Sequence, residues 1–386
     1  MTAEASRSTR VLYIIDSLGH GGAEKSLAEM APYLVGGGID LHVAVLHDRD
    51  GFADQVRAAG AYLHSVAGGH GRIGWLTRLM TLQRSLQPDL MHTTLFDSDI
   101  LGRVVAAAGR TPIVSSWVSV QYGEVYDNEF VAPRWKLSAV KSLDLATSRL
   151  VRRFHAVSAP VAEAMCAELR IPAQRVEVIP RGRDRRRLGE PGAERRERVR
   201  RRLGLGAEQV VLNVARQDHA KGLDVLLHAW TIVVEESPAS LLLLAGRNGT
   251  RSQQVRALIS ELGLGSNVRL LGVRDDVPDL LCAADAFVLP SRREGLPGAL
   301  LEAMALQVPI VATDIPTILE AVPGGRYAAL VPVDDGIALA QAISDSLSDR
   351  TSAALRASRA RARFDERFTI ARVSSHMCSF YEMALS

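Results

Sequence analysis

Residues Val288–Met304 read VLPSRREGLPGALLEAM. This stretch combines the signals of a strand, a turn and a helix. The apolar run Asp285–Leu289 predicts a short strand that is covered on both faces. Pro290 ends this strand, and Gly295–Gly298 (GLPG) predicts a turn whose glycines allow a ligand to approach the backbone closely. From Ala299 the apolar spacing becomes helical. Helix N-termini at the carboxyl ends of parallel strands bind phosphates and sugars, so this stretch predicts a ligand site.

Two carboxylates, Glu294 and Glu302, bracket the turn with seven residues between them. The spacing, with Glu-Gly-Leu-Pro inside it and Leu-Leu-Glu-Ala-Met closing it, resembles the E-x7-E motif of retaining GT-B glycosyltransferases, family 4 especially. The resemblance implies that Glu294 contacts the transferred sugar and that Glu302 binds the ribose hydroxyls of the nucleotide. A helical glutamate alone usually belongs to a solvated face, so the flanking residues carry the identification.

The length and composition of the chain are those of an ordinary globular protein. A chain of 386 residues, 47% hydrophobic and 23% charged, is long enough for two domains with separate cores. Met1–Arg10 lacks the apolar segment of a secretion signal, and runs such as Leu241–Ala245 are too short to span a bilayer. Three scattered cysteines, Cys166, Cys282 and Cys378, suggest neither a disulfide framework nor a metal site. We therefore expect a cytoplasmic protein.

Charge is nearly balanced overall but basic in one segment. A net charge of +3 gives no case for a nucleic-acid partner. Arg181–Arg202, however, holds eleven arginines against four acidic residues. One interpretation is an anionic partner, either the inner face of a membrane or a phosphorylated acceptor. The other is a solvated helix with Glu/Arg pairs, directly after an inter-domain hinge.

Strand-like and helical segments alternate along both halves of the chain, which predicts parallel sheets with helices on both faces. The expected strands of the first half are Arg10–Asp16, Leu41–Leu46, Asp89–His92, Pro112–Val118, Phe154–Ser158 and Val176–Pro180. Those of the second half are Val210–Ala215, Leu241–Ala245, Val268–Leu271, Phe287–Leu289, Ile310–Ala312 and Ala329–Val331. A hinge is expected near Pro180–Gly182.

The fold class that the resemblance implies is GT-B, with two Rossmann-like domains whose parallel sheets face each other across a cleft. The first domain, residues 1–180, would bind the acceptor, and the second, residues 181–366, would bind the donor. Phe364–Leu385 has helical apolar spacing and is similar to the final helix of these proteins. We therefore assign residues 367–386 to a helix that crosses back to the first domain.

The second domain opens with NVARQDHAKGLDVLLHAW, which resembles the family's G-R-x4-K-G pattern and points to Arg216 and Lys221 as catalytic cations. The leaving diphosphate gains negative charge in the transition state, and fixed cations stabilise it there. Arginine can contact two phosphate oxygens, whereas lysine acts as a point charge. With both present, no metal is expected to be needed. Ala215 stands where relatives usually have glycine.

Further donor contacts follow from the same resemblance. The loop before the first helix holds Gly21 and Gly22, whose backbone N–H groups could face the diphosphate. Gly246 opens a glycine loop after a buried strand, and Val273 and Arg274 stand where relatives contact the base. Gly295, Leu296 and Pro297 complete the expected donor site beside Glu294.

The acceptor side departs from the family pattern. His92 is present in PDLMHTTLFDSD, but Thr94 replaces a second histidine, and no histidine closes the next strand. The acceptor contacts we consider are His92, Asp97 and Tyr122, with Asp99, Gln121 and Glu124 nearby. For His92 the alternative is a hydrogen-bonded residue at a strand end. After the hinge strand, Arg181-Gly182-Arg183-Asp184 replaces the usual Asn-Gly-Val-Asp, so two arginines either reach an anionic acceptor or shape the hinge.

Taken together, the sequence predicts a retaining, metal-independent glycosyltransferase. It would move a hexose or N-acetylhexosamine from a nucleotide-diphosphate sugar, most often a UDP-sugar in this family, to a hydroxyl of a glycan, lipid-linked or natural-product acceptor. No cofactor is expected. The main alternative is a catalytically silent nucleotide-sugar-binding or scaffold protein of the same fold. A dinucleotide-dependent oxidoreductase would need Gly-x-Gly-x-x-Gly, which Gly19–Gly22 lacks.

Overall fold

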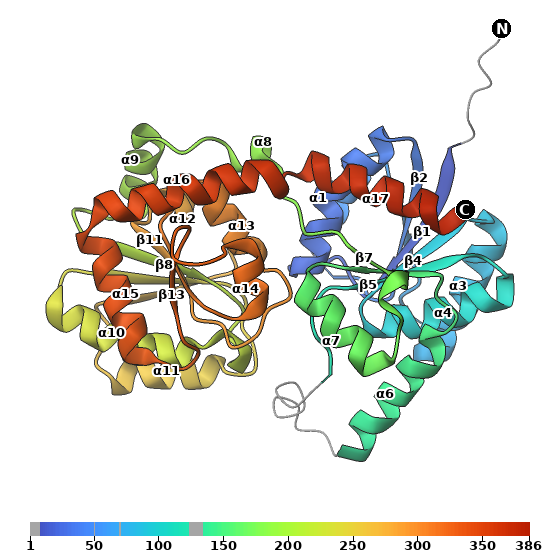
Figure 1. The fold of residues 1–386 in the computed structure, drawn as a ribbon, viewed down its shortest axis with the longest axis horizontal. Coiled ribbons are helices and arrows are strands. Elements are labelled where there is room, and N and C mark those ends of the chain that lie inside the picture. Colours follow the sequence, from blue (N-terminus) through green and yellow to red (C-terminus); the bar gives the residue numbers. More distant parts are fainter. Residues whose placement is uncertain (1–7, 50, 69–70, 123–133) are drawn as a thin grey trace, which may run out of the picture. The chain divides into compact units, whose positions relative to one another are not determined.

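The structure, a computed structural model, describes residues 8–49, 51–68, 71–122 and 134–386. The chain divides into two compact units: Met1–Gly182 with Ile370–Ser386, and Arg183–Thr369. Each unit holds one parallel sheet with helices on both faces, as the ribbon in Figure 1 shows.

The first unit is built on a seven-stranded sheet in the order β3-β2-β1-β4-β5-β6-β7. All strand pairs that the structure describes in this sheet are parallel. The strands are β1 (Thr9–Ile15), β2 (Ile39–Val45), β3 (Tyr62–Ser65), β4 (Leu90–Thr94), β5 (Ile113–Trp117), β6 (Arg153–Ala156) and β7 (Val176–Val178).

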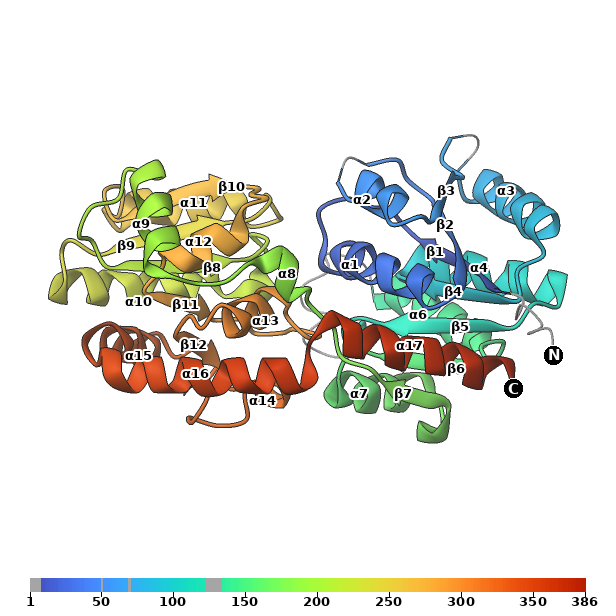
Figure 2. The ribbon, with the colours of Figure 1, turned by 90° about the horizontal axis from the view of Figure 1, so that it is seen from above.

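Helices cover both faces of this sheet because its central strands are apolar on both sides. Val11, Tyr13 and Ile15 of β1 join one core with α1 and α17, while Leu12 and Ile14 join the other core with α3 and α4. Figure 2 shows α17 lying along α1. The helices are α1 (Gly22–Gly36), α2 (Ala53–Ala58), α3 (Gly71–Leu86), α4 (Phe96–Gly109), α6 (Arg134–Ser148), α7 (Ala159–Leu169), the short 3-10 helix η1 (Ala173–Arg175) and α17 (Ile370–Leu385).

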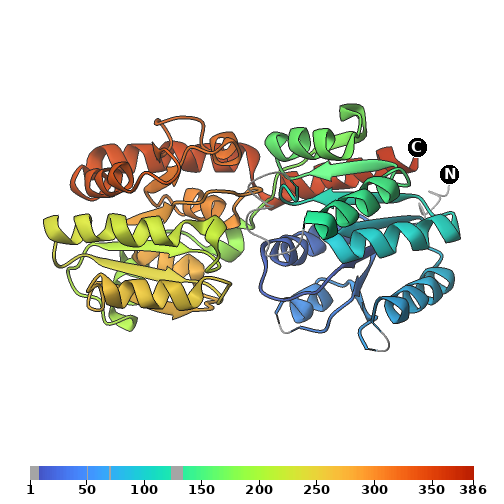
Figure 3. The same cartoon turned by 90° about the horizontal axis from the view of Figure 1, so that it is seen from below.

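The second unit has a six-stranded parallel sheet in the order β10-β9-β8-β11-β12-β13. Its strands are β8 (Val210–Val214), β9 (Leu241–Ala245), β10 (Val268–Gly272), β11 (Ala286–Leu289), β12 (Ile310–Thr313) and β13 (Ala329–Val331). One face packs against α10, α11 and α15, and Figure 3 shows α10 and α11 side by side. The helices are α8 (Arg185–Leu188), α9 (Ala193–Arg202), η2 (His219–Lys221), α10 (Leu223–Glu236), α11 (Ser252–Glu261), α12 (Val277–Ala283), α13 (Gly298–Ala305), α14 (Pro316–Ala321), α15 (Gly336–Ser348) and α16 (Arg350–Arg367).

The expected strands are all present, and two details differ. The edge strand β3 was not predicted, because Tyr62–Ser65 is short and has no buried residue. The C-terminal helix, expected over residues 367–386, begins slightly later, since α16 ends at Arg367 and α17 spans Ile370–Leu385. At the break, the carbonyl oxygen of Phe368 accepts a hydrogen bond from the backbone N–H of Arg183 at 2.9 Å, and Thr369 forms a parallel bridge with Arg183.

Candidate active site

Lys221 and Glu294 meet at the carboxyl edge of the second sheet. Lys221 Nζ donates to Glu294 Oε1 at 2.8 Å, and the Ser291 hydroxyl donates to the same oxygen at 2.8 Å. Gly222 allows this approach, because its φ is +61° and a Cβ there would collide with the carbonyl oxygen of Pro290. The structure therefore brings together two of the three predicted catalytic residues, and it adds Ser291, which the sequence signalled only as the residue after a strand.

Arg216, the third predicted catalytic residue, follows β8 and pairs with Asp218. Its side chain is 48% exposed, so it can reach a ligand. Asp218 Oδ1 also accepts a hydrogen bond from the backbone N–H of Thr250 at 2.8 Å, which fixes the loop after β9. Asp218 was not predicted, because an aspartate two residues after an arginine has no distinctive pattern.

The glycine loop that begins at Gly246 lies against the same edge. Gly246 has a φ of +143°, and a Cβ there would collide with the carbonyl oxygen of Ala215. Its backbone N–H donates to the carbonyl oxygen of Gly272 at 2.7 Å, which joins the ends of β9 and β10. The predicted base contacts follow directly after Gly272. Val273 is exposed, and the guanidinium of Arg274 contacts both carboxylate oxygens of Asp276 at 2.8 and 2.7 Å.

The turn of the motif leads into α13 and positions Glu302. Gly295 and Leu296 precede Pro297, which stands at the N-terminal boundary of α13, and Leu296 is buried. Glu302 is only 2% exposed. Its Oε1 accepts a hydrogen bond from Arg183 Nε at 2.8 Å. This pair was missed, because the two residues are 119 positions apart.

In the first unit, the glycine loop enters α1 as expected. Gly21 is the N-terminal cap residue in an extended conformation, and Gly22 begins the helix. The carboxylate of Glu24 folds back beside Gly21, so that a Cβ on Gly21 would collide with it. A Cβ on Gly22 would lie 2.7 Å from Nη1 of Arg181, which places that arginine next to the first turn of the helix. The Glu24 carboxylate and the Arg181 guanidinium therefore both lie beside the first turn of α1.

His92 corresponds to the alternative of a hydrogen-bonded residue at a strand end. It is fully buried, with Nδ1 2.7 Å from the Tyr381 hydroxyl and Nε2 2.6 Å from Ser116 Oγ. Ser116 Oγ lies 2.7 Å from Nδ1 of His155, whose Nε2 lies 2.8 Å from the carbonyl oxygen of Ile179. With both ring nitrogens engaged, His92 does not present itself to an acceptor, which corrects that expectation.

This chain of hydrogen bonds has a defined direction. The carbonyl of Ile179 can only accept, so His155 Nε2 carries a proton and its Nδ1 accepts from the Ser116 hydroxyl. Ser116 then accepts from His92 Nε2, and His92 Nδ1 accepts from the Tyr381 hydroxyl. Burial lowers the pKa of His155 to about 4 and the pKa of His92 well below its ordinary value, so both rings are neutral at pH 7. The chain connects α17 to β4, β5, β6 and the residue that follows β7.

The other two predicted acceptor residues differ in accessibility. Asp97 lies in the first turn of α4, partly exposed, and pairs with Arg72 at 2.8 Å. Tyr122 is buried, and its hydroxyl donates to Asp144 at 2.6 Å. Burial and the nearby charge of Asp144 raise the pKa of Tyr122. Tyr122 therefore supports the fold of the first unit rather than facing an acceptor, which corrects its assignment, and Glu124 lies outside the described residues.

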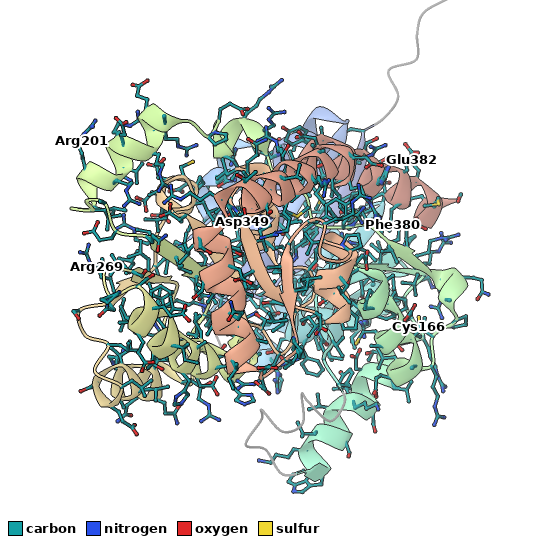
Figure 4. The ribbon with its side chains drawn as sticks, turned by 60° about the vertical axis from the view of Figure 1, so that its left-hand side comes forward. Cys166, Arg201, Arg269, Asp349, Phe380 and Glu382 are labelled. Carbon is teal, nitrogen blue, oxygen red and sulfur yellow. The ribbon has the colours of Figure 1, made fainter. Side chains whose placement is uncertain are left out.

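The basic segment is largely compensated by acidic neighbours. Arg195 pairs with Asp279 at 2.9 Å, and Arg196 pairs with Asp285 at 2.8 Å. Arg202 contacts Asp276 and Asp279. Figure 4 shows Arg201 extending outward from α9, where it pairs with Glu197 at 3.7 Å. The geometry favours a helix with ion pairs over an uncompensated anion-binding face.

Within residues 8–49, 51–68, 71–122 and 134–386, the chain has neither a cluster of metal ligands nor a membrane-spanning helix. In this part of the chain, no group of three or more histidine, cysteine, aspartate or glutamate side chains is placed to hold a metal ion. None of the helices within the described ranges has the length and apolar character needed to cross a bilayer.

Comparison with protein families finds two models that match in succession. Residues 20–187 match "Glycosyltransferase Family 4", and residues 208–349 match "Glycosyl transferases group 1". The lipopolysaccharide core biosynthesis mannosyltransferase LpsB of Rhizobium meliloti is 30% identical over 240 residues, which are 60% of this chain and 67% of LpsB. An Escherichia coli UDP-Gal:alpha-D-GlcNAc-diphosphoundecaprenol alpha-1,3-galactosyltransferase is 27% identical over 62% of this chain and 61% of its own length. Several other relatives are matched over less than half their length.

Solved structures agree over nearly the whole chain. HepE of Anabaena, in a crystal structure with UDP-glucose, has a TM-score of 0.85 at 21% identity and covers 97% of this chain and 99% of that one. Sucrose-phosphate synthase of Thermosynechococcus elongatus has a TM-score of 0.81 at 20% identity, covering 97% of this chain and 98% of that one. These likenesses establish the GT-B fold that the sequence predicted. Because both family models and a relative at this identity agree with the fold, the chain belongs to glycosyltransferase family 4.

Proposed function

We propose that this glycosyltransferase moves a hexose or N-acetylhexosamine from a nucleotide-diphosphate sugar, with UDP as the first candidate carrier, and retains the anomeric configuration. The observation that carries the proposal is the cluster at the edge of the second sheet. Lys221 and Ser291 hold the Glu294 carboxylate at 2.8 Å each, and the half-exposed Arg216 follows the neighbouring strand β8. In the proposed division of roles, the second unit binds the donor and the first unit binds the acceptor.

The chemistry follows from these groups. The bond between the anomeric carbon and the phosphate oxygen breaks while the acceptor oxygen bonds to that carbon on the same face. The leaving phosphate takes the acceptor proton. Arg216 and Lys221 stabilise the charge that develops on the diphosphate, and this electrostatic term replaces a metal. Glu294 orients the hydroxyls of the sugar. Its carboxylate is suited to this role because Lys221 and Ser291 hold it in place.

The nucleotide is proposed to lie along α13 and the end of β10. Glu302 would accept hydrogen bonds from the ribose hydroxyls, and backbone groups of Val273 and Arg274 would contact the base. The fixed side chain of Arg274, held by both oxygens of Asp276, leaves its backbone as the contact to the base.

The acceptor is proposed to be a hydroxyl of a glycan, a lipid-linked glycan or a natural product. The Escherichia coli relative is named for an acceptor of the lipid-linked class, which supports placing that class first. Of the three predicted acceptor-binding residues, Asp97 is partly exposed, and we propose that it contacts the acceptor.

Calorimetric titration with UDP, GDP and ADP tests the donor site. We expect one of the three to bind to the wild type and to bind more weakly to Glu302→Ala. Glu261→Ala is the matched control, because Glu261 is an exposed glutamate at the end of α11 in the same unit. If none of the three binds to the wild type, the proposal fails, and a silent scaffold with this fold becomes the better interpretation.

A further inference from the structure

Arg183 is fixed in an unusual place for an arginine. It is the first residue of the second unit, and its side chain is 1% exposed. Its backbone N–H donates to the carbonyl oxygen of Phe368 at 2.9 Å, and its backbone also pairs with Thr369. The start of the unit is thereby anchored to the end of α16, and the side chain points inward from that anchor.

The guanidinium of Arg183 lies between Glu302 and the start of α13. Nε donates to Glu302 Oε1 at 2.8 Å. A Cβ on Gly298, the first residue of α13, would collide with Nη2 of Arg183, so only glycine leaves room for the guanidinium here. A cation at a helix N-terminus is electrostatically unfavourable. The Glu302 carboxylate, one turn along the same helix, offsets that cost.

The pair has consequences for Glu302 as well. A buried carboxylate pays a large desolvation cost unless a partner compensates it, and Arg183 supplies both a charge and a directed hydrogen bond. Arginine holds its charge at every accessible pH. Glu302 is thus held in one orientation on α13, beside the turn of Gly295–Pro297.

We infer that Arg183 is a positioning residue of the donor site, which keeps Glu302 ionised and oriented for the ribose hydroxyls. The inference rests on the proposed donor role of Glu302. It assigns a function to one of the two arginines that distinguish this hinge from the usual Asn-Gly-Val-Asp.

The test is the affinity for whichever of UDP, GDP and ADP the wild type binds, measured by calorimetry from pH 6 to pH 9 for the wild type and Arg183→Val. The wild type should bind with little pH dependence. Arg183→Val should bind about 10- to 100-fold more weakly at neutral pH, the loss seen when residues that orient metal ligands are removed. Loss of the Arg183 charge should raise the pKa of the buried Glu302 carboxyl, so the lost affinity should return in part as the pH rises.

Three further variants separate positioning from a structural role. Arg183→Lys should restore part of the affinity and remove most of the pH dependence. Arg187→Val is the control, because Arg187 is an exposed arginine of the neighbouring α8. If Arg183→Val does not fold, Gly298→Ala provides the measurement, since it keeps both charges and displaces the guanidinium.

The outcomes distinguish this inference from the proposed function. If the wild type binds none of UDP, GDP and ADP, the proposed function fails. If the wild type binds one of them and the folded Arg183→Val, or Gly298→Ala in its place, binds it equally well with the same pH profile, the inference is overturned. In a Glu302→Gln background, adding Arg183→Val should change the affinity little, and a full additional loss would also contradict the positioning role.

Discussion

Replacing Lys221 with alanine should lower kcat/KM by about 10³-fold, because the leaving diphosphate loses a fixed positive charge. The magnitude follows from the geometry. Nζ is held 2.8 Å from Glu294 Oε1, and the side chain is 20% exposed, so its position is set before the donor binds. A unit charge about 4 Å from the leaving oxygen, at an effective dielectric constant of about 20, contributes about 4 kcal/mol. This is close to the cost of removing one donor from an oxyanion-stabilising site, about 3–4 kcal/mol.

Lys221→Ala also leaves Glu294 without its cation, so part of the loss should come from repulsion between that carboxylate and the diphosphate. The double variant Lys221→Ala/Glu294→Gln should therefore be less impaired in donor binding than Lys221→Ala alone. Release of UDP from the donor that calorimetry identifies provides the assay, and Arg256→Ala, an exposed arginine of α11, is the control for loss of one charge. A correctly folded Lys221→Ala enzyme with near-normal turnover would refute the role of Lys221.

Three other predictions concern the first unit and the leaving group. Ser116→Ala removes a hydrogen-bond partner from both His92 Nε2 and His155 Nδ1, and should lower the free energy of unfolding by about 2–5 kcal/mol. Thermal denaturation measures the effect, with Ser85→Ala as the control, and an unchanged midpoint would contradict it. Burial raises the pKa of Asp99 from 3.8 to about 7, so over this window the folded state keeps a proton that the unfolded chain has released. Asp99 therefore makes the fold less stable as the pH rises from about 4 to about 7, and Asp99→Asn should remove that contribution from a series of denaturation curves, whereas identical pH profiles would exclude it. Chelator should leave turnover nearly unchanged, because two cationic side chains neutralise the leaving group, and a strict metal requirement would disprove this.

The fold was predictable because its signals are local. Buried strands such as Leu241–Ala245 are continuous apolar runs, and the turn before α13 combines glycine and proline in a stretch of four residues. The strand β3 was not predicted because it lacks such a signal: Tyr62–Ser65 lies at a sheet edge and carries no buried residue. Local patterns report burial, and an edge strand has little of it.

The pairing of polar residues was not predictable, because partners distant in sequence leave no local pattern. His92 and Tyr381 are 289 positions apart, and Arg183 and Glu302 are 119 apart. The residues Lys221, Glu294 and Glu302 were each identified from a motif, but nothing in the motifs says what each one contacts before a donor binds. Topology decides that, by bringing loops from β8, β9 and β11 to one edge of the sheet.

The predicted donor residues of the second unit are compensated in the structure. Lys221 pairs with Glu294, Arg216 with Asp218, and Arg183 with Glu302. Because each cation has its own carboxylate, a diphosphate must compete for Lys221 and Arg216 rather than fill an uncompensated positive site. On the proposed function, the sugar would help in this competition, since its hydroxyls would take the place of Lys221 as hydrogen-bond donors to Glu294. On the proposed function, a donor that carries both diphosphate and sugar would satisfy both halves of the Lys221–Glu294 pair and a free nucleotide only one, so we expect the pair to favour the complete substrate over the product nucleotide.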